Sequence, residues 1–233
     1  MSRMPYATRK NSLGRRSSML IVPAWGNWCQ IGFFGHEAPP RAMKKIRGLY
    51  AITSERDNAS LSEKVRAVLR GGAATLQYRD KSGDTGRRRS EAIDLAMMCR
   101  NAGACFIVND DIELAREVGA DGVHLGKDDS GIGRARALMG PDMLIGASCY
   151  NCIDYGRRAV AEGADYLAFG SFFASTTKPD AVHADPALLM RAREEFDVPL
   201  VAIGGISTQN AAGLIVAGAD AVAVSSALFG SED

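Results

Sequence analysis

Four segments of this chain resemble one another, and their spacing limits what the chain can fold into. Each runs from a Gly-Ala pair into a short apolar stretch: GGAATLQYR (71–79), VGADGVHLG (118–126), EGADYLAFG (162–170) and AGADAVAVS (217–225). The glycine is typical of a helix end, and the apolar stretch predicts a strand. The pairs begin at residues 72, 119, 163 and 218, so they are 47, 44 and 55 residues apart. This spacing is too long for one strand–helix unit and suits two.

A second set of apolar stretches lies between the repeats, as two units per repeat require. They are GLYAIT (48–53), ACFIVND (104–110), MLIGAS (143–148) and PLVAIGG (199–205). The intervening sequence includes amphipathic helical patterns, such as 61–71 and 110–120. Eight strands alternating with helices predict a parallel α/β fold. The fourfold repeat favours a closed (β/α)8 (TIM) barrel over an open doubly wound sheet. Because the chain stops at Asp233, soon after the eighth strand, we expect the last helix to be truncated or missing.

The first part of the chain does not conform to this pattern. Residues 1–47 carry nine Lys and Arg against one acidic residue, Glu37, and show no sustained period of 2 or 3.6. We expect residues 1–43 to be a basic, disordered extension and residues 44–233 to be the catalytic barrel domain. An organelle leader and a start codon assigned too early are two explanations of the extension. The remainder has 19 basic and 26 acidic groups, which argues against nucleic-acid binding. No stretch is apolar over the roughly 18 residues that a membrane span needs.

The cysteine count indicates a reducing environment. Five cysteines are an odd number in a chain of this length, so a disulfide framework is not expected and a cytoplasmic location is. Cys149 and Cys152 form a C-x-x-C pair without a second pair of ligands nearby. We interpret them as two small residues that follow a strand.

Polar residues follow most of the predicted strands, at the end of a barrel where catalysis takes place. Arg79, Lys81 and Lys178 are cations, and Asp110 and Asp129 are oxygen ligands of the kind that suits Mg²⁺. Backbone N–H groups after the last two strands, at 204–205 and 225–226, suit a phosphate. Two cationic patches, one with a metal, predict a diphosphate next to a monophosphate.

The histidines are not expected to act as bases. His124 lies inside a predicted strand and His183 lies in a loop, and neither has an evident Ser or Cys partner by sequence. A site with many phosphate contacts and no nucleophile–base pair suggests departure of a diphosphate through charge neutralisation.

The motifs QYRDK, NDD, GVHLGKDD, GASCY, TTK, AIGGI and the Ser pair after the eighth strand occur in this order. With them, the chain from about Arg47 to Phe229 resembles the thiamine phosphate synthase (thiamine-phosphate diphosphorylase) family. The resemblance implies a Mg²⁺-dependent transferase of thiamine biosynthesis. Such an enzyme joins 4-amino-2-methyl-5-pyrimidinylmethyl diphosphate to 4-methyl-5-(2-phosphoethyl)thiazole through a dissociative pyrimidine cation.

The same resemblance implies roles for individual residues. The catalytic residues would be Arg79, Lys81, Lys178 and Ser148, and the metal ligands Asp110 and Asp129. The side chains at the pyrimidine diphosphate would be Gln77, Tyr78, Arg79, Asp80, Lys81, Asn109, Ser148 and Lys178. Those at the thiazole phosphate would be Ser175, Thr176, Thr177, Gly205, Ser225 and Ser226.

The chain departs from the family pattern at four places. Lys127 stands where Gln is frequent, and Ser175 stands in place of a Thr. Tyr150 replaces a frequent His, and Ser225 replaces an aliphatic residue. An additional cation at Lys127 either contributes to binding or faces solvent.

Three alternatives to a synthase stay open. A tautomerase-like relative would bind the thiazole phosphate without coupling, but such relatives carry His where this chain has Ser148. A pseudoenzyme would bind without turnover, and other phosphate-binding barrels need an acid/base pair that is missing here. In each case we expect small phosphorylated molecules as partners, neither nucleic acid nor membrane, and we leave homo-oligomer formation open.

Overall fold

The structure is a computed structural model, and it describes residues 46–54, 61–126, 131–174 and 183–230. The described elements belong to one compact unit, residues 41–233. The extension predicted over residues 1–43 lies outside the described residues. Within the described ranges, no helix combines the length and the apolar character needed to cross a membrane.

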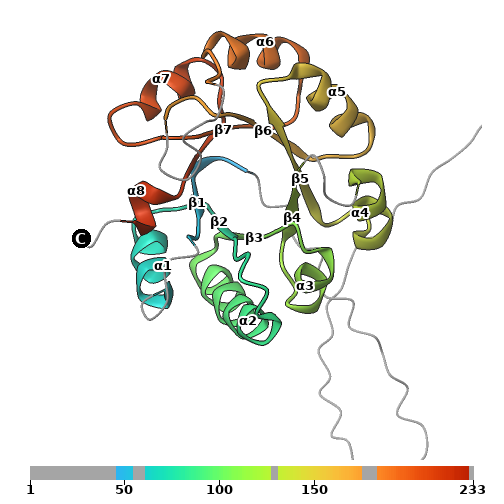
Figure 1. Ribbon diagram of the computed structural model, residues 1–233, viewed down its shortest axis with the longest axis vertical. Helices are drawn as coiled ribbons and strands as arrows, with labels where there is room; N and C mark the ends of the chain where they lie inside the picture. Colours follow the sequence, from blue (N-terminus) through green and yellow to red (C-terminus); the bar gives the residue numbers. More distant parts are fainter. Residues whose placement is uncertain (1–45, 55–60, 127–130, 175–182, 231–233) are drawn as a thin grey trace, which may run out of the picture. The chain divides into compact units, whose positions relative to one another are not determined.

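Eight parallel strands close into a barrel, which confirms the predicted fold (Figure 1). They are β1 (Gly48–Ile52), β2 (Thr75–Tyr78), β3 (Cys105–Asn109), β4 (Gly122–Leu125), β5 (Leu144–Tyr150), β6 (Tyr166–Gly170), β7 (Leu200–Ile203) and β8 (Ala221–Val224). Each strand pairs with the next, and β1 pairs with β8 to complete the ring.

A helix follows each strand and lies outside the ring (Figure 1). These helices are α1 (Leu61–Arg70), α2 (Thr85–Ala102), α3 (Ile112–Glu117), α4 (Ile132–Met139), α5 (Ile153–Ala161), α6 (Ala187–Glu195), α7 (Ala211–Val216) and α8 (Ser226–Phe229). The four-residue α8 confirms the expected short last helix among the described residues. Its last carbonyl, on Phe229, accepts a 2.8 Å hydrogen bond from Lys64 Nζ, which ties it to α1.

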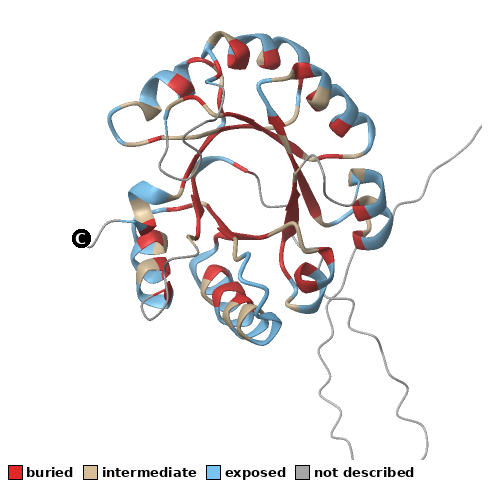
Figure 2. Ribbon diagram, in the orientation of Figure 1, coloured by how far each residue is buried: buried red, intermediate tan, exposed pale blue. Residues whose placement is uncertain are grey.

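Successive strand residues alternate between two apolar layers, because side chains of a strand point to opposite faces. Ala51, Leu76 and Phe106 pack under the helices, whereas Tyr50 and Ile107 lie in a separate cluster inside the barrel. The strands are accordingly the most deeply buried part of the fold (Figure 2).

Three of the four repeats share a Gly-Ala-Asp sequence, and the structure gives it one task. Its glycine ends a helix with a positive φ, and its aspartate caps the beginning of the preceding strand. The carboxylates accept backbone N–H groups in the pairs Asp121–Phe106 (2.8 Å), Asp165–Ile145 (2.7 Å) and Asp220–Leu200 (2.7 Å). Each aspartate N–H also donates to the carbonyl of the same partner. The repeat therefore closes the end of the barrel that lies opposite the catalytic strand ends.

Candidate active site

The strand ends bring most of the sequence-predicted site residues to one mouth of the barrel. Gln77 lies near the end of β2, Asn109 ends β3, and Ser148 lies within β5. Gly205 and Ser225 follow β7 and β8. Six predicted or singled-out residues lie outside the described residues, namely Lys127, Asp129, Ser175, Thr176, Thr177 and Lys178.

A lysine and a carboxylate from neighbouring strand ends form an ion pair at this mouth. Lys81 Nζ lies 3.6 Å from Asp110 Oδ2, and the two side chains are 55% and 31% exposed. Asp110 has a φ of 63°, which is uncommon for a residue with a side chain, and its N–H donates to the His124 carbonyl at 2.9 Å. A non-glycine residue held in this region is a frequent feature of functional sites.

Asp110 fits the role of a metal ligand. Its carboxylate is a hard oxygen donor, is partly exposed, and stands next to a lysine that a phosphate oxygen can also approach. Among the described residues, no group of three or more His, Cys, Asp or Glu side chains is placed to hold a metal ion. Mg²⁺ suits such a site because it retains water and phosphate oxygens as ligands.

Arg79 is held in position by the end of β1. Thr53 Oγ1 accepts the Arg79 N–H at 2.9 Å and donates to the Arg79 carbonyl at 3.2 Å. Thr53 is only 2% exposed, so this double contact is fixed by packing. The backbone from which the Arg79 side chain projects is therefore rigid where β2 ends.

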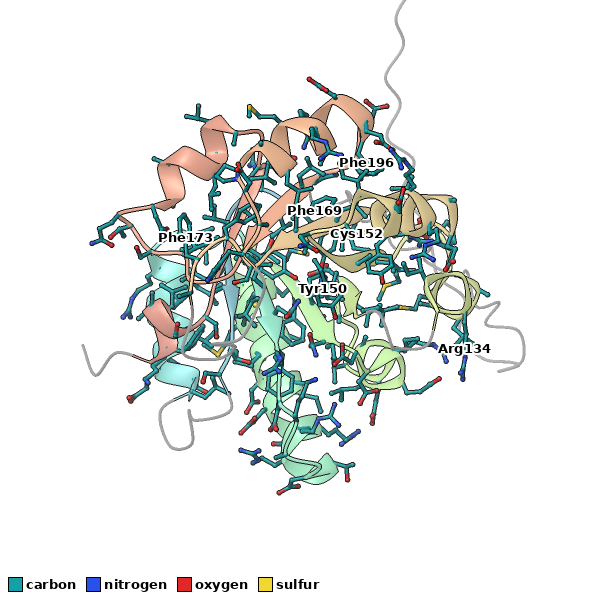
Figure 3. The ribbon with its side chains drawn as sticks, turned by 45° about the horizontal axis from the view of Figure 1, so that its top comes forward. Arg134, Tyr150, Cys152, Phe169, Phe173 and Phe196 are labelled. Carbon is teal, nitrogen blue, oxygen red and sulfur yellow. The ribbon has the colours of Figure 1, made fainter. Side chains whose placement is uncertain are left out.

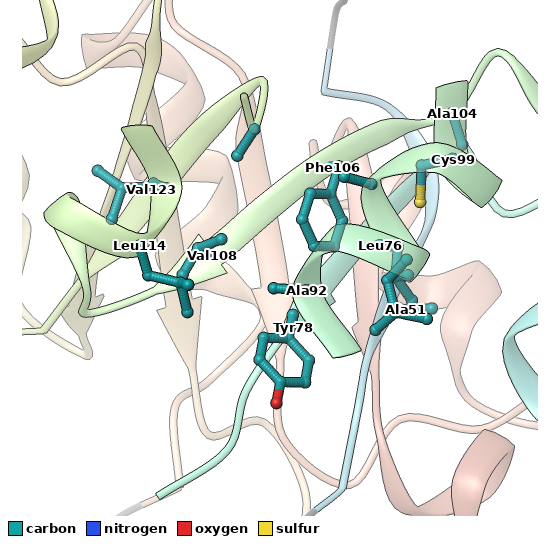
Figure 4. Packing of buried hydrophobic residues seen from close by; sticks show 14 of the residues in the cluster. Ala51, Leu76, Tyr78, Ala92, Cys99, Ala104, Phe106, Val108, Leu114 and Val123 are labelled. Atoms are coloured by element: carbon teal, nitrogen blue, oxygen red, sulfur yellow. The ribbon is translucent and has the colours of Figure 1, made fainter. Parts of the chain in front are cut away.

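The Tyr78 side chain points away from the barrel interior, so the structure does not support the predicted contact of this side chain with the substrate. It is 2% exposed and packs with Leu76, Ala92 and Phe106 between strands and helices (Figure 4). Its hydroxyl donates to Glu91 Oε2 of α2 at 2.7 Å. Burial, followed by the neighbouring Glu91, raises the pKa of Tyr78. The alternation of β2 places Gln77 inside the barrel and therefore Tyr78 outside it.

The Asp80 carboxylate also forms its contacts within the protein. Its Oδ2 lies 2.6 Å from Arg87 Nη2, and its Oδ1 accepts the Ser82 N–H at 2.7 Å. Burial alone would raise the pKa of this carboxyl, but the Ser82 hydrogen bonds and the charges of Arg87 and Arg88 hold it below its ordinary value. Asp80 therefore shapes the loop that carries Lys81, and a direct substrate contact by its side chain is not supported.

A chain of hydrogen bonds crosses the barrel interior beneath the mouth. Gln77 Nε2 donates to Tyr50 Oη at 2.9 Å, and Tyr50 Oη lies 2.9 Å from Tyr166 Oη. Tyr166 Oη lies 3.1 Å from His124 Nδ1, and His124 Nε2 lies 2.9 Å from Ser148 Oγ. The expectation that His124 has no serine partner was therefore wrong. Inward alternation on two neighbouring strands would have been the signal for this contact.

Gly146 makes room for the chain. In the barrel register it pairs with His124 on one side and with Tyr166 on the other. A Cβ at this position would lie 2.0 Å from Tyr166 Cζ and 2.5 Å from His124 Nδ1. The glycine in GASCY is thus required for packing inside the barrel.

The local structure requires glycine at positions 204 and 205. Their φ angles are 105° and 59°, and a Cβ on Gly205 would lie 2.3 Å from the Ala174 carbonyl oxygen. The described loop after β6 therefore packs directly on these glycines. Among the described residues, the backbone hydrogen bonds of turns, loops and caps do not use the N–H groups of Gly205, Ser225 or Ser226, and these groups suit an anionic ligand.

Cys149, Tyr150 and Asp111 have structural roles outside the predicted chemistry. Cys149 is a buried free thiol whose pKa is raised to about 12 by burial, then by Cys152, so the C-x-x-C pair is structural. Tyr150 is 41% exposed (Figure 3). Its ring makes an edge contact with Tyr155 of α5, with the ring centroids 6.5 Å apart. Asp111 caps α3 by accepting the Leu114 N–H at 2.9 Å.

The fold and the groups at the barrel mouth define a (β/α)8-barrel enzyme with cations, a carboxylate and backbone N–H groups at its strand ends. A family model described as thiamine monophosphate synthase matches residues 49–228. The chain belongs to this family and is therefore a transferase of thiamine biosynthesis. Enzymes of this family use a metal ion.

Individual relatives agree with this assignment. The chain is 54% identical over 187 residues to thiamine-phosphate synthase of Thiobacillus denitrificans, covering 80% of this chain and 89% of the relative. It is 52% identical to thiamine-phosphate synthase of Chromobacterium violaceum, covering 84% and 92%. Thiamine phosphate pyrophosphorylase from Pyrococcus furiosus matches in structure with a TM-score of 0.73 and 38% identity, covering 80% and 89%. An N-acetylmannosamine-6-phosphate 2-epimerase from Clostridium perfringens, at 12% identity and a TM-score of 0.61, shares the fold alone.

Proposed function

We propose that this chain is a thiamine-phosphate synthase that joins the pyrimidine diphosphate to the thiazole phosphate described above. The observation that carries this proposal is the Lys81–Asp110 pair, which combines a cation and a metal-type ligand at the mouth of a barrel of this family. A diphosphate that leaves with Mg²⁺ needs both kinds of group in one place.

The reaction follows from the groups at the mouth. The bond between the pyrimidine methylene carbon and the diphosphate oxygen breaks, and its electron pair leaves with the diphosphate. Arg79, Lys81 and Lys178 bind the departing group. The lone pair of the thiazole nitrogen then forms the new bond to the methylene carbon, and the positive charge passes to the thiazolium ring.

Asp110 and Asp129 would hold the Mg²⁺, which supplies charge neutralisation of the diphosphate. Gln77, Asn109 and Ser148 would bind the pyrimidine end of the substrate. The thiazole phosphate would contact Ser175, Thr176, Thr177, Gly205, Ser225 and Ser226. The described cysteines are free thiols, and this supports action in the reducing cytoplasm.

An assay of metal dependence tests the proposal. Purified protein is mixed with both substrates, with Mg²⁺ or with EDTA, and thiamine phosphate is measured by chromatography. We expect product only with Mg²⁺, and a loss of product in the Asp110→Ala, Asp129→Ala double variant. A protein that is folded by circular dichroism and binds the thiazole phosphate, yet forms no product, would instead be the non-coupling relative.

A further inference from the structure

The buried hydrogen-bond chain from Gln77 to Ser148 has a defined direction. Gln77 Nε2 is the donor at its first step, so Tyr50 Oη accepts there and keeps its own proton for Tyr166. If Tyr166 donated to Tyr50 instead, the Tyr50 proton would be buried without a partner, which is costly. Tyr166 therefore donates to His124 Nδ1, and the ring proton of His124 that faces Ser148 lies on Nε2.

The last step sets the orientation of the serine. The His124 Nε2 proton points to Ser148 Oγ, which makes this oxygen an acceptor within the protein. The serine hydroxyl proton is then directed elsewhere. Both tyrosines stay protonated along the chain, because burial, as the largest cause, raises the pKa of each. At each step of this hydrogen-bond chain, the donor and the acceptor are therefore set by the preceding step.

We propose that this hydrogen-bond chain determines whether the residues at its two ends, Gln77 and Ser148, act as donors or acceptors toward the substrate. Gln77 is held with an amide N–H turned toward Tyr50, so that its Oε1 accepts from the ligand. Ser148 is held as a hydroxyl donor to the ligand. Tyr50, Tyr166 and His124 are thus positioning residues, which act through Gln77 and Ser148. An aminopyrimidine diphosphate offers the matching amino donor and the matching ring-nitrogen or phosphate acceptors.

The contact roles of Gln77 and Ser148 rest on the proposed function, but the direction of the chain does not. It is therefore tested first without any substrate. The protein contains three histidines, His36, His124 and His183. In ¹⁵N-histidine-labelled protein, the His124 signals are identified by their loss in His124→Gln. We expect the ring proton of wild-type His124 to lie on Nε2.

A Tyr166→Phe variant removes the donor to Nδ1 without changing the ring. We expect the His124 signals to shift toward a mixture of the two tautomers. A wild-type His124 with its proton on Nδ1 would overturn the proposal, because the chain would then run in reverse. Signals that stay unchanged in Tyr166→Phe would also overturn it.

Kinetics then tests the link to the substrate contacts. Tyr50→Phe and Tyr166→Phe are each expected to lower kcat/KM for the pyrimidine diphosphate by about 10-fold or more. The KM for the thiazole phosphate should stay within about twofold. Because the chain acts as one unit, the double variant should lose little more than the worse single variant. Tyr155→Phe, on the outer helix α5, is the matched control and should keep wild-type kinetics.

The NMR signals and the kinetics distinguish a failure of the proposed function from a failure of the positioning role. A protein that makes no thiamine phosphate but shows the expected His124 tautomer would contradict the proposed function and leave the direction of the chain intact. An active protein in which the two tyrosine variants reduce kcat/KM multiplicatively, or equally for both substrates, would overturn the positioning role.

Discussion

Lys81 Nζ stands 3.6 Å from Asp110 Oδ2, so the loop after β2 meets the end of β3 through opposite charges. Neither residue alone defines a phosphate site. Together they place a cation beside a metal-type ligand, and each limits where the other can point. A diphosphate with its Mg²⁺ would replace this direct pairing by contacts to both groups.

Removing the lysine charge should slow the reaction without unfolding the protein. Lys81 is more than half exposed, so Lys81→Met costs little stability. We expect kcat/KM for the pyrimidine diphosphate to fall by about 100-fold, as for removal of one preorganised charge contact. Arg66→Met, at an exposed position of α1, is the control and should keep wild-type kinetics. A Lys81→Met enzyme with unchanged kinetics would remove Lys81 from the site.

Adding one methyl group at Gly146 should disrupt the barrel interior. The new Cβ would overlap Tyr166 and His124, so Gly146→Ala is expected to destabilise the protein by about 1–3 kcal/mol in urea unfolding. Gly133→Ala is the matched control, because a Cβ there meets nothing within 4 Å. It should leave stability unchanged or raise it by up to about 1 kcal/mol. Equal stabilities of the two variants would contradict the packing around Gly146.

The aspartates of the Gly-Ala-Asp repeat should affect stability and not the chemistry. Asp165 accepts the Ile145 N–H and pairs with Arg136 at the closed end of the barrel. We expect Asp165→Ala to cost about 1–3 kcal/mol, because it leaves a backbone donor unpaired. Asp154→Ala removes an exposed ion pair with Arg157 and should leave the stability nearly unchanged. A fall in kcat/KM of folded Asp165→Ala protein would argue against this separation.

Asp80 should make stability depend on acidity. Its folded-state pKa lies below its ordinary value of 3.8, so its contribution is fully present above that value. The contribution is lost as the pH falls from about 4 through the folded pKa. The difference in unfolding free energy between wild type and Asp80→Asn should therefore be largest near pH 7 and shrink toward pH 3. A difference that does not change with pH would contradict the contacts of Ser82 and Arg87 with this carboxylate.

The fold could be predicted from the sequence because its signals are local and repeated. Gly72, Gly119, Gly163 and Gly218 each end a helix with positive φ, and an apolar strand follows each. These repeats, together with the apolar stretches between them, predicted all eight strands and the closed ring. They did not give the caps made by Asp121, Asp165 and Asp220, because these bonds join a residue to the strand before it. No spacing along the chain reports such a contact.

The site was predictable to the level of the strand end and not to the level of the side-chain direction. Gln77 and Lys81 were placed at the mouth, but Tyr78 between them turns to α2 because β2 is still extended there. The pairing of His124 with Ser148 escaped prediction because the residues are 24 positions apart and meet only after β4 and β5 align. Alternation along the two strands indicates that both side chains point into the barrel, but the strand register that brings them into contact does not follow from the sequence pattern.

The central claim is that this barrel joins two phosphorylated molecules with release of diphosphate. The most direct measurement is the amount of diphosphate released against the amount of thiamine phosphate formed, with both substrates present and with each one omitted. The account predicts a ratio of one to one, with thiamine phosphate formed only when both substrates and Mg²⁺ are present. Folded protein that retains the thiazole phosphate but forms no thiamine phosphate under these conditions would contradict it.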